Sequence, residues 1–501
     1  MSETLVKLNG IGISFSGVQI LEGIDFELKK GEIHCLIGEN GSGKSTIVKI
    51  IAGVYKPDCG TVELGGKTYT AVNSVAAMEA GIQIIWQDFS LFPNLSVYEN
   101  IALNDDLYNK RTFVNKKQRR ELAKKALEMI NVDLDLDARV ETLPVAKKQL
   151  VAIARAISNN AKLVIMDEPT TSLTKNEVKA LFKVIRHLQS QGVTILFISH
   201  KLDEVFDISE TFSIIRNGKK VKDGLTKDFN SDDFVYYMTG RKIDTELLTV
   251  PEPAADEVPI LEVKNLCLKD EFDNINFKVY KGEVLGITGL LGSGRTELAL
   301  SIYGMYPPTS GEVYLNGEKI HVKSVADSLD KGIVYLPEDR LSEGLCMNRS
   351  IMHNMHLSSY DSFKKNGKGA MDIQAMEEET KKWVEKFHIV VADIHNAIRT
   401  LSGGNAQKVL LSRLMSLNPK VLLLNLPTVG VDVGAKFDIH AEIRRIAAEG
   451  VGAVVISDDL EEVYKNCNRI LVMRQGRITQ ELKNTETSIE ELGNIISGQD
   501  K

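Results

Sequence analysis

Short apolar runs alternate along the chain with longer segments of helical periodicity. The runs at 33–38, 162–167 and 193–199 are dominated by Ile, Leu and Val and show no regular polar alternation. Runs of this kind are typical of strands in a sheet that helices cover on both faces. The segment at 115–130 carries its apolar residues on one face and predicts an amphipathic helix. Together these elements predict an α/β fold.

The same patterns occur twice in the same order. GIQIIWQD at 81–88 returns as GIVYLPED at 332–339, which is 251 residues later. LVIMDEPT at 163–170 returns as LLLNLPT at 422–428, and here the aligned residues are 258 apart. Two copies of one domain account for this pattern, the second being about seven residues longer.

The repeat divides the chain into two domains and a linker. We expect the first domain at 1–245 and the second at 260–501, with the extra residues of the second copy between 339 and 401. The segment at 246–259 is expected to be the linker, because it is rich in Pro and acidic residues and proline restricts the backbone to extended conformations.

Composition excludes some classes of function. Among 501 residues, 61 Lys and Arg face 68 Asp and Glu, a net charge of −7, so nucleic acid is not expected as a partner. The basic cluster at 115–130 is interpreted as a solvated helix face. No apolar run reaches the roughly 18 residues of a membrane span. The five scattered cysteines fit a reducing compartment, so we expect a cytosolic protein that meets a membrane only through partners.

The sequence GENGSGKST at 38–46 predicts a phosphate-binding loop. It matches GxxxxGK[ST] and stands directly between a predicted strand and a predicted helix, the context that this motif requires. Backbone N–H groups would surround phosphate oxygens, Lys44 would hold the β- and γ-phosphates, and the Ser45 hydroxyl would bind Mg²⁺. The expected nucleotide-binding residues of this loop are Gly38, Asn40, Gly41, Ser42, Gly43, Lys44, Ser45 and Thr46.

Four polar side chains follow other predicted strands of the first domain. Asp167 is expected to hold Mg²⁺ and Glu168 to polarise the attacking water for displacement at the γ-phosphate. Gln87 is expected to touch the metal or the water, with a plain surface amide as the alternative. His200 is expected to hydrogen-bond the γ-phosphate, and a structural histidine is its alternative.

These motifs and their spacing resemble the ATP-binding-cassette (ABC) ATPases over essentially the whole chain. The resemblance implies two tandem cassettes, each with a RecA-like core, a β-subdomain and a helical subdomain that carries a signature sequence. It implies ATP and Mg²⁺ as ligands, and adenine stacking for Phe15, for which a core aromatic is the alternative.

The resemblance also implies head-to-tail pairing, so that each ATP lies between the phosphate loop of one domain and the signature of the other. The first composite site then joins the first domain's loop to the signature LSGGN of the second. The expected contributors from the signature are Ser402, Gly403, Gly404 and Asn405.

The second composite site is expected to be inactive. Arg295 replaces the loop lysine, and Asn425-Leu426 replaces the Asp-Glu pair, which removes the group that polarises water. Asp458 replaces the histidine and would repel phosphate. The opposing signature has Pro144 in place of serine, which removes both a hydroxyl and an N–H.

Within the family, the chain is similar to the ATP-binding subunits of bacterial simple-sugar importers of the ribose, galactose and xylose class. GLLGSGRTEL at 289–298 and LSGGNAQKV at 401–409 carry this likeness. It implies two membrane permease subunits and an extracytoplasmic solute-binding protein as partners, and a peripheral position at the cytoplasmic face of the cell membrane. The coupling surface is expected at 88–100, whose aromatics have core packing as the alternative.

Three alternatives remain open. A nucleoside or signalling-molecule importer would have the same architecture, because other subunits select the solute. A ribosome-associated ABC protein would have a long charged linker and two intact sites, which this chain lacks. A structural ATP-sensing clamp would show negligible turnover.

Overall fold

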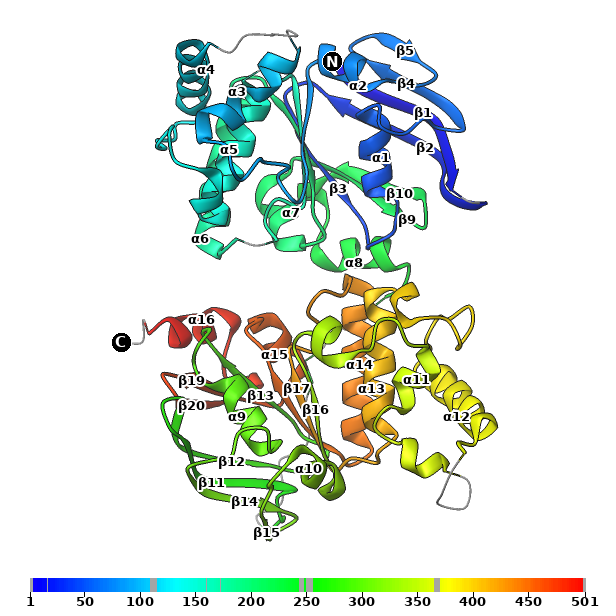
Figure 1. The fold of residues 1–501 in the computed structure, drawn as a ribbon, viewed down its shortest axis with the longest axis vertical. Helices are drawn as coiled ribbons and strands as arrows, with labels where there is room; N and C mark the ends of the chain where they lie inside the picture. The colour runs from blue at the N-terminus through cyan, green and yellow to red at the C-terminus, as the bar shows by residue number, and fades with distance from the viewer. Residues whose placement is uncertain are drawn as a thin grey trace. The chain divides into compact units, whose positions relative to one another are not determined.

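The computed structural model of the chain describes residues 3–15, 17–108, 115–158, 160–171, 173–242, 247–248, 256–364 and 370–498. The chain divides into two compact units, Met1–Ile243 and Asp244–Lys501, and each has its own hydrophobic core (Figure 1). The repeat in the sequence is therefore a repeat in the fold.

The first unit contains two sheets. The antiparallel sheet has the order β2 (Val18–Lys29), β1 (Thr4–Phe15), β4 (Cys59–Leu64) and β5 (Lys67–Tyr69). The second sheet has the order β10 (Lys219–Leu225), β9 (Thr211–Arg216), β3 (Ile33–Ile37), β8 (Thr194–Ile198), β7 (Leu163–Asp167) and β6 (Ile82–Ile85). All neighbours in this sheet are parallel except β9 and β10. The carboxyl ends of β3, β6, β7 and β8 therefore meet at one edge.

Eight α-helices surround the described sheets of this unit. They are α1 (Lys44–Ile51), α2 (Ser74–Glu79), α3 (Val97–Tyr108), α4 (Lys116–Met129), α5 (Val145–Ile157), α6 (Lys175–Ser190), α7 (Leu202–Ile208) and α8 (Ser231–Thr239), with short 3₁₀ turns η1 (Val140–Thr142) and η2 (Thr226–Asp228). The side chain of Asn115 caps α4 by accepting the Gln118 N–H at 3.2 Å. The three predicted strands and the predicted amphipathic helix are confirmed as β3, β7, β8 and α4.

The core of the first unit lies between its two sheets. Apolar side chains of α1 pack against those of β1, β2 and β4 on one side and of β7 and β8 on the other. The helices α3, α4 and α5 form a separate layer on the opposite flank from the antiparallel sheet (Figure 1). This arrangement fixes the start of α1, and the loop before it, at the edge where the parallel strands end.

The second unit has the same plan. Its antiparallel sheet has the order β12 (Phe272–Val279), β11 (Leu261–Leu268), β14 (Ser310–Leu315) and β15 (Glu318–Ile320). Its six-stranded sheet has the order β16 (Ile333–Leu336), β17 (Val421–Asn425), β18 (Gly452–Ile456), β13 (Val284–Gly289), β19 (Arg469–Arg474) and β20 (Arg477–Lys483).

The helices of the second unit follow the same order along the chain. They are α9 (Arg295–Ile302), α10 (Val325–Lys331), α11 (Ile351–His356), α12 (Ile373–Lys386), α13 (Gly403–Met415), α14 (Val433–Ala448), α15 (Leu460–Asn466) and α16 (Ile489–Ser497). Shorter turns are the π-helical η3 (Arg340–Gly344) and the 3₁₀ turns η4 (Tyr360–Phe363), η6 (Ile398–Thr400) and η7 (Asn484–Glu486).

Leu248 of the expected linker is attached to the second unit. Residues 246 and 249–255 lie outside the described residues. Leu248, by contrast, donates its N–H to the Lys465 carbonyl at 3.1 Å and accepts from Asn484 Nδ2 at 2.8 Å. Its side chain packs on the second unit's core.

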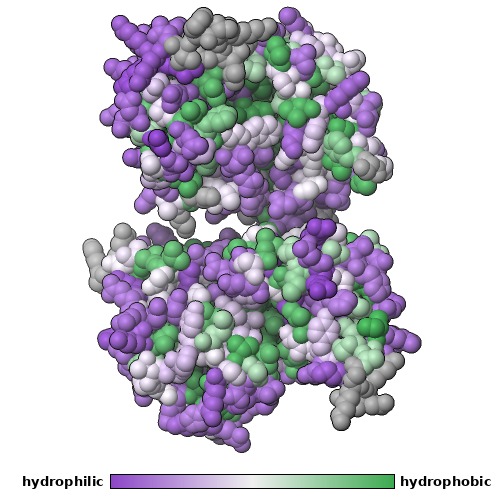
Figure 2. Space-filling model, in the orientation of Figure 1, coloured by the Kyte–Doolittle hydropathy of each residue, from purple (hydrophilic) through white to green (hydrophobic). Residues whose placement is uncertain are grey.

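The face of each unit that Figure 2 shows carries both polar and apolar side chains, which are interspersed. Among the described residues, no helix has the length and apolar character needed to span a membrane.

Candidate active site

The phosphate-binding loop lies where the sequence predicts it, between β3 and α1. The Gly43 φ angle is +109°, a left-handed conformation that disfavours other residues. At Gly38, an added Cβ would lie 2.3 Å from the Ile215 carbonyl oxygen, so a side chain there is excluded by neighbouring backbone. These two glycines let the loop turn tightly from the strand into the helix.

Lys44 is folded back over its own loop. Its Nζ donates to the carbonyls of Gly38 at 2.7 Å and Glu39 at 2.9 Å, and the residue is buried. Burial lowers the pKa of Lys44, while the carboxylates of Glu168 and Asp167 act in the opposite direction. These two bonds use two of the three donors of the Lys44 ammonium group, and the carboxylates of Asp167 and Glu168 at the strand end are close enough to act on its charge. Within the described residues, the buried Ser42 hydroxyl also has no hydrogen-bond partner.

Asp167 and Glu168 end strand β7 beside this loop. Burial, and then the charge of Glu168, raise the pKa of Asp167, and the Ser45 hydroxyl opposes this shift by hydrogen bonding. A divalent cation at Ser45 and Asp167 would offset the cost of the buried carboxylate, so this donor set fits Mg²⁺. Glu168 has a φ of +47°, and its N–H bonds the Ile198 carbonyl at 3.1 Å.

His200 contacts the expected catalytic carboxylate. Its Nδ1 lies 3.0 Å from Glu168 Oε1. This hydrogen bond is the main cause that lowers the pKa of Glu168, against the opposing effect of burial. The structure thus brings His200 to the group that would polarise water, and Glu168 is kept ionised.

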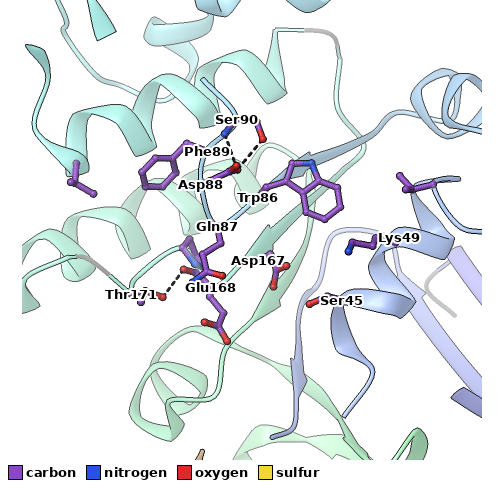
Figure 3. Close-up of a pocket in the computed structure, with 13 residues that line it drawn as sticks. Ser45, Lys49, Trp86, Gln87, Asp88, Phe89, Ser90, Asp167, Glu168 and Thr171 are labelled. Carbon is purple, nitrogen blue, oxygen red and sulfur yellow. Dashed lines mark hydrogen bonds between the residues drawn. The ribbon is translucent and has the colours of Figure 1, made fainter. Parts of the chain in front are cut away.

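Gln87 lines a cavity together with Ser45, Asp167 and Glu168. The cavity has a volume of about 770 Å³, and Ser45, Gln87, Asp167 and Glu168 line it from three different strand ends (Figure 3). Gln87 is exposed in the turn after β6. Three of the four polar side chains that the sequence places after strands, those of Gln87, Asp167 and Glu168, therefore line one cavity with Ser45, as parallel strand ends require. The fourth, His200, contacts Glu168.

Phe15 is exposed and not part of the core. It ends β1 with 41% of its side chain accessible. The ring of Tyr55 meets it edge-on at 5.1 Å between centroids, and Lys49 Nζ lies 5.2 Å from the Tyr55 ring. Sequence reasoning did not single out Tyr55, because an isolated tyrosine after a helix carries no motif.

The segment at 88–100 mixes exposed and buried aromatics. Phe92 is 52% exposed, whereas Tyr98 of α3 is buried, with Lys116 and Arg120 of α4 over its ring. Phe89 and Ser90 both have positive φ angles, and Arg155 of α5 holds their carbonyls at 2.8 and 2.7 Å. The turn after Gln87 is therefore tied to the helix that carries the first domain's signature.

The second unit's loop is occupied by its own side chains. Arg295 takes the position of Lys44 and donates to the Gly289 carbonyl. Its other nitrogen lies 3.7 Å from Asp458 Oδ2, so the loop cation already has an anionic neighbour. Asp458, from which we expect repulsion of phosphate, is thus also the ion-pair partner of Arg295.

The residues of the second unit at the positions of Ser45 and Asp167 form a neutral network. Asn425, in the place of Asp167, donates Nδ2 to the hydroxyl of Tyr335 at 3.1 Å and of Thr296 at 3.4 Å. Burial raises the pKa of Tyr335 to about 12, so its hydroxyl stays neutral. The sequence gives no signal for this role of Tyr335, because the residue lies in an apolar run that predicts a strand. Leu426 keeps the left-handed backbone of Glu168, with a φ of +48°.

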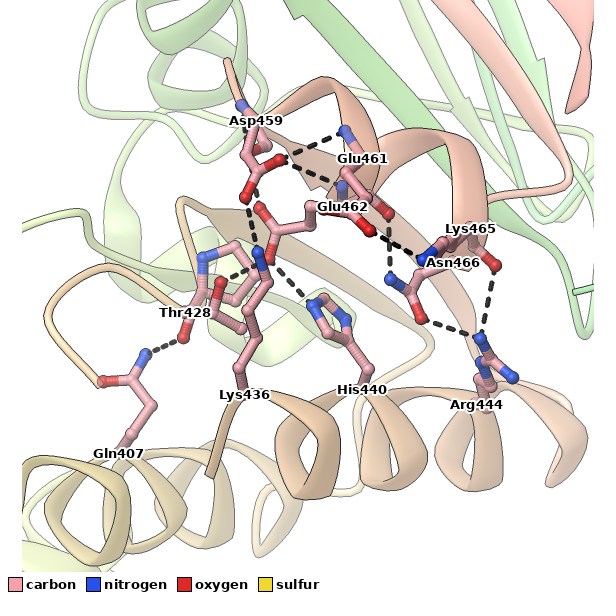
Figure 4. A network of polar contacts seen from close by, with 12 residues as sticks. Gln407, Thr428, Lys436, His440, Arg444, Asp459, Glu461, Glu462, Lys465 and Asn466 are labelled. Carbon is pink, nitrogen blue, oxygen red and sulfur yellow. Dashed lines mark hydrogen bonds and ion pairs between the residues drawn. The ribbon is translucent and has the colours of Figure 1, made fainter. Parts of the chain in front are cut away.

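A buried polar network lies behind this strand end (Figure 4). The carboxylate of Glu462 accepts hydrogen bonds from Thr428 and Ser457 at 2.5 Å each, and His440 Nε2 lies 2.9 Å from it. Burial alone raises the pKa of Glu462, but His440, Lys436 and Ser457 together lower it to about 2. The first unit repeats the pair of hydroxyl contacts around Glu204.

The two signatures have similar backbones and different chemistry. Ser402 caps α13, and its hydroxyl accepts from Asn405 N at 3.4 Å and from Asn405 Nδ2 at 3.0 Å. Asn405 Oδ1 also accepts the Val390 N–H at 2.9 Å. Pro144 caps α5 with almost the same φ and ψ but offers no hydroxyl.

The signature glycines are required by packing within the second unit. A Cβ on Gly404 would lie 2.3 Å from Ala435 Cβ of α14. A Cβ on Gly403 would lie 2.8 Å from Arg340 Nη2 and 2.9 Å from the Gly430 carbonyl. Sequence reasoning predicted these glycines for close approach to phosphate and missed this second reason.

The arrangement of loop, strand-end carboxylates and signature defines an ATPase of the cassette type. The ABC transporter family matches residues 21–171 and 272–429. The chain belongs to this family, as two tandem ABC ATPase domains.

Full-length relatives are similar along the whole chain. The ribose import ATP-binding protein RbsA of Clostridium perfringens is 40% identical over 495 residues, which cover 99% of this chain and 98% of the relative. The protein of the same name from Clostridium tetani is 38% identical, with 97% and 96% covered. That from Bacillus licheniformis is 37% identical, with 98% and 99% covered.

Proposed function

We propose that the chain is the ATP-hydrolysing subunit of a monosaccharide importer, and that it hydrolyses ATP at one composite site only. The observation that carries this proposal is the contrast between the two units. In the first, Ser45, Asp167, Glu168 and Gln87 face one cavity. In the second, the equivalent loop cation faces Asp458, which stands in the place of His200.

In the proposed mechanism, the loop N–H groups and Lys44 bind the phosphates of ATP. Bound Mg²⁺, held by Ser45, Asp167 and Gln87, would neutralise charge between the phosphates. Glu168 then accepts a proton from the attacking water, and the hydrogen bond with His200 favours its ionised carboxylate. In the same step His200 would donate to the γ-phosphate, and the exposed ring of Phe15 would stack on adenine.

The signature of the second domain would complete this site in a head-to-tail arrangement. The Ser402 hydroxyl and the N–H groups at the start of α13 provide donors for a γ-phosphate, supported by the helix dipole. Pro144 offers neither a hydroxyl nor an N–H to the other nucleotide. ATP would hold the two domains closed, and hydrolysis would release them.

The proposed substrate and partners follow from the relatives. Three relatives named as ribose import proteins are 37–40% identical over nearly the full length. We therefore expect transport of a pentose or related sugar, two permease subunits, a solute-binding protein outside the cell, and a peripheral position at the cytoplasmic face of the membrane. The exposed Phe92 lies in the segment at 88–100 that we assign to permease contact.

The test replaces Glu168 by Gln in the full-length chain. We expect ATP turnover to fall at least about 100-fold, with ATP binding retained, because the side chain keeps its size and loses its basicity. Uptake of labelled ribose by cells that carry this variant should be lost in parallel. The matched control is Leu426→Gln, at the same backbone position of the second unit, which should retain both activities.

Two results would contradict the proposal. Turnover near the wild-type rate in Glu168→Gln would remove Glu168 from catalysis. If cells with Glu168→Gln lose uptake of nucleosides but keep normal uptake of sugars, the chain is still the ATPase of an importer, and the transported solute is a nucleoside.

A further inference from the structure

The turn after Glu338 in the second unit is fastened to the loop after β17 by one side chain. Arg340 begins the π-helical turn η3, and Asp339 caps this turn by accepting the Leu341 N–H at 2.9 Å. The Arg340 guanidinium donates to the Val429 carbonyl and, at 2.7 Å, to the Gly430 carbonyl. It therefore bridges η3 and the loop after β17.

The same guanidinium is in contact range of the signature backbone. A Cβ on Gly403 would lie 2.8 Å from Arg340 Nη2, and a Cβ on Gly430 would lie 3.2 Å from it. Arg340 is partly withdrawn from solvent, and burial lowers its pKa. Three segments of the second unit thus meet around one planar cation. A side chain at Gly403 would clash with it, and one at Gly430 would be crowded against it.

The corresponding turn of the first unit, described in full over 88–100, is shorter and has no residue in the place of Arg340. Asn100 and Asn354 have the same role, since each donates its amide to a carbonyl eight residues back, at 3.0 and 3.1 Å. These two residues are 254 positions apart, whereas Gln87 and Glu338 are 251 apart. Three extra residues therefore lie in the second unit's turn, where Arg340 stands.

At the far end of the turn, equivalent arginine contacts hold the two units' turns to their signature helices. Arg413 of α13 donates to the Gly344 carbonyl at 2.7 Å, as Arg155 of α5 donates to the Ser90 carbonyl at 2.7 Å. In the first unit, Val145 stands where Gly403 stands in the second, and it borders the open cavity together with the turn. The second unit fills the comparable space with the Arg340 side chain.

We infer that Arg340 is a positioning residue for the signature, holding the backbone at Gly403 in the place from which its N–H groups meet the γ-phosphate. The inference rests on the proposed function, in which the signature completes the ATP site of the first domain. The planar fork of arginine suits this task because it reaches two carbonyls at once, and lysine offers a single nitrogen.

The test compares ATP with ADP, because only ATP carries the phosphate that the signature would contact. Dissociation constants are measured by calorimetry on the full-length Glu168→Gln chain with Mg²⁺. Arg340→Ala should weaken ATP binding about 10- to 100-fold and leave ADP binding unchanged, since displacement of a contact by about 1 Å has effects of this size. Arg340→Lys should give an intermediate loss.

The matched control is Leu341→Ala in the same turn. Its side chain is 54% exposed, so both affinities should stay at the Glu168→Gln values. Circular dichroism and thermal unfolding establish that each variant is folded. If Arg340→Ala does not fold, Arg340→Lys decides: full ATP affinity overturns the inference, and a selective loss supports it.

A second signature variant separates this inference from the proposed function. Ser402→Arg places a large side chain at the exposed helix cap and should also weaken ATP selectively. If Ser402→Arg weakens ATP and Arg340→Ala does not, only the role of Arg340 is overturned. If neither does, the composite site itself is wrong. An equal loss of ATP and ADP in Arg340→Ala overturns the inference as well, because it indicates a general defect.

Discussion

At the scale of residues, the two strand ends share a backbone and differ in chemistry. Glu168 and Leu426 both adopt left-handed φ angles, of +47° and +48°. Their N–H groups bond the carbonyls of Ile198 and Ile456, at 3.1 and 2.8 Å. The neighbouring strand thus imposes the conformation whatever the side chain is, and such strain persists because the surroundings fix it.

The contact between His200 and Glu168 leads to a prediction on pH dependence. The hydrogen bond from His200 lowers the pKa of Glu168, so the carboxylate stays ionised to lower pH. Replacing His200 by Ala removes this effect and raises the pKa. We expect the acid limb of the kcat/KM profile for ATP to move to higher pH, in addition to a lower overall rate.

His200→Gln is the control, because an amide still donates to Glu168 and the limb should move less. Profiles whose acid limbs coincide in wild type and His200→Ala would contradict the prediction.

At the scale of elements, helix packing fixes the signature independently of nucleotide. Helices α13 and α14 approach so closely at Gly404 that a methyl group would lie 2.3 Å from Ala435 Cβ. The corresponding residue of α5 is Ala146, and Glu177 of α6 occupies the position that corresponds to Ala435. The same glycine therefore permits helix packing and, in the proposed site, would also permit backbone approach to phosphate.

This packing predicts the effect of Gly404→Ala. The variant should lose about 1–3 kcal/mol of unfolding free energy, since the helices must separate to admit the methyl group. Chemical denaturation without nucleotide is the measurement. Adding Ala435→Gly should restore most of the loss through coupling of the two sites. A single variant as stable as wild type would contradict the packing argument.

At the scale of the whole molecule, the two units have separate cores and each holds one tryptophan. Trp86 packs on the core of the first unit and Trp383 on that of the second. The chain has two tryptophans in all, so fluorescence of single-tryptophan variants reports each unit in turn. Unfolding of such a chain need not be a single transition.

The network around Glu462 supplies a change confined to one unit. His440 stands where the first unit has Phe182, so His440→Phe fits the fold and removes the partner of a buried carboxylate. We expect the second unit to lose about 3 kcal/mol at neutral pH. The transition reported by Trp383 should move, and that reported by Trp86 should move much less.

The same variant has a pH signature. The pKa of Glu462 in the folded state is lowered to about 2, below its ordinary value. Its negative charge therefore stabilises the fold at pH values above that ordinary pKa, and this stabilisation is lost as pH falls towards 2. The difference between wild type and His440→Phe should therefore shrink on acidification. A constant difference, or an equal effect on Trp86, would contradict the assignment.

The sequence by itself determined the repeat, the α/β class, and the residues at the ends of β3, β6, β7 and β8. These features are local, because an apolar run with a motif directly after it specifies both the strand and the loop at its carboxyl end. Since parallel strands end at one edge, convergence of Ser45, Gln87, Asp167 and Glu168 could also be predicted from the sequence.

Only the tertiary structure decided the pairing of side chains that are far apart in the chain. The contact of Asp458 with Arg295, the Asn425–Tyr335 hydrogen bond and the bridge from Arg340 to Gly430 join residues 90 or more positions apart. No spacing rule predicts such contacts, because they depend on how closely packed elements place each rotamer. The residues at strand ends can therefore be predicted from the sequence. The ion pair of Arg295 with Asp458 and the bridge from Arg340 to Gly430 arise from packing.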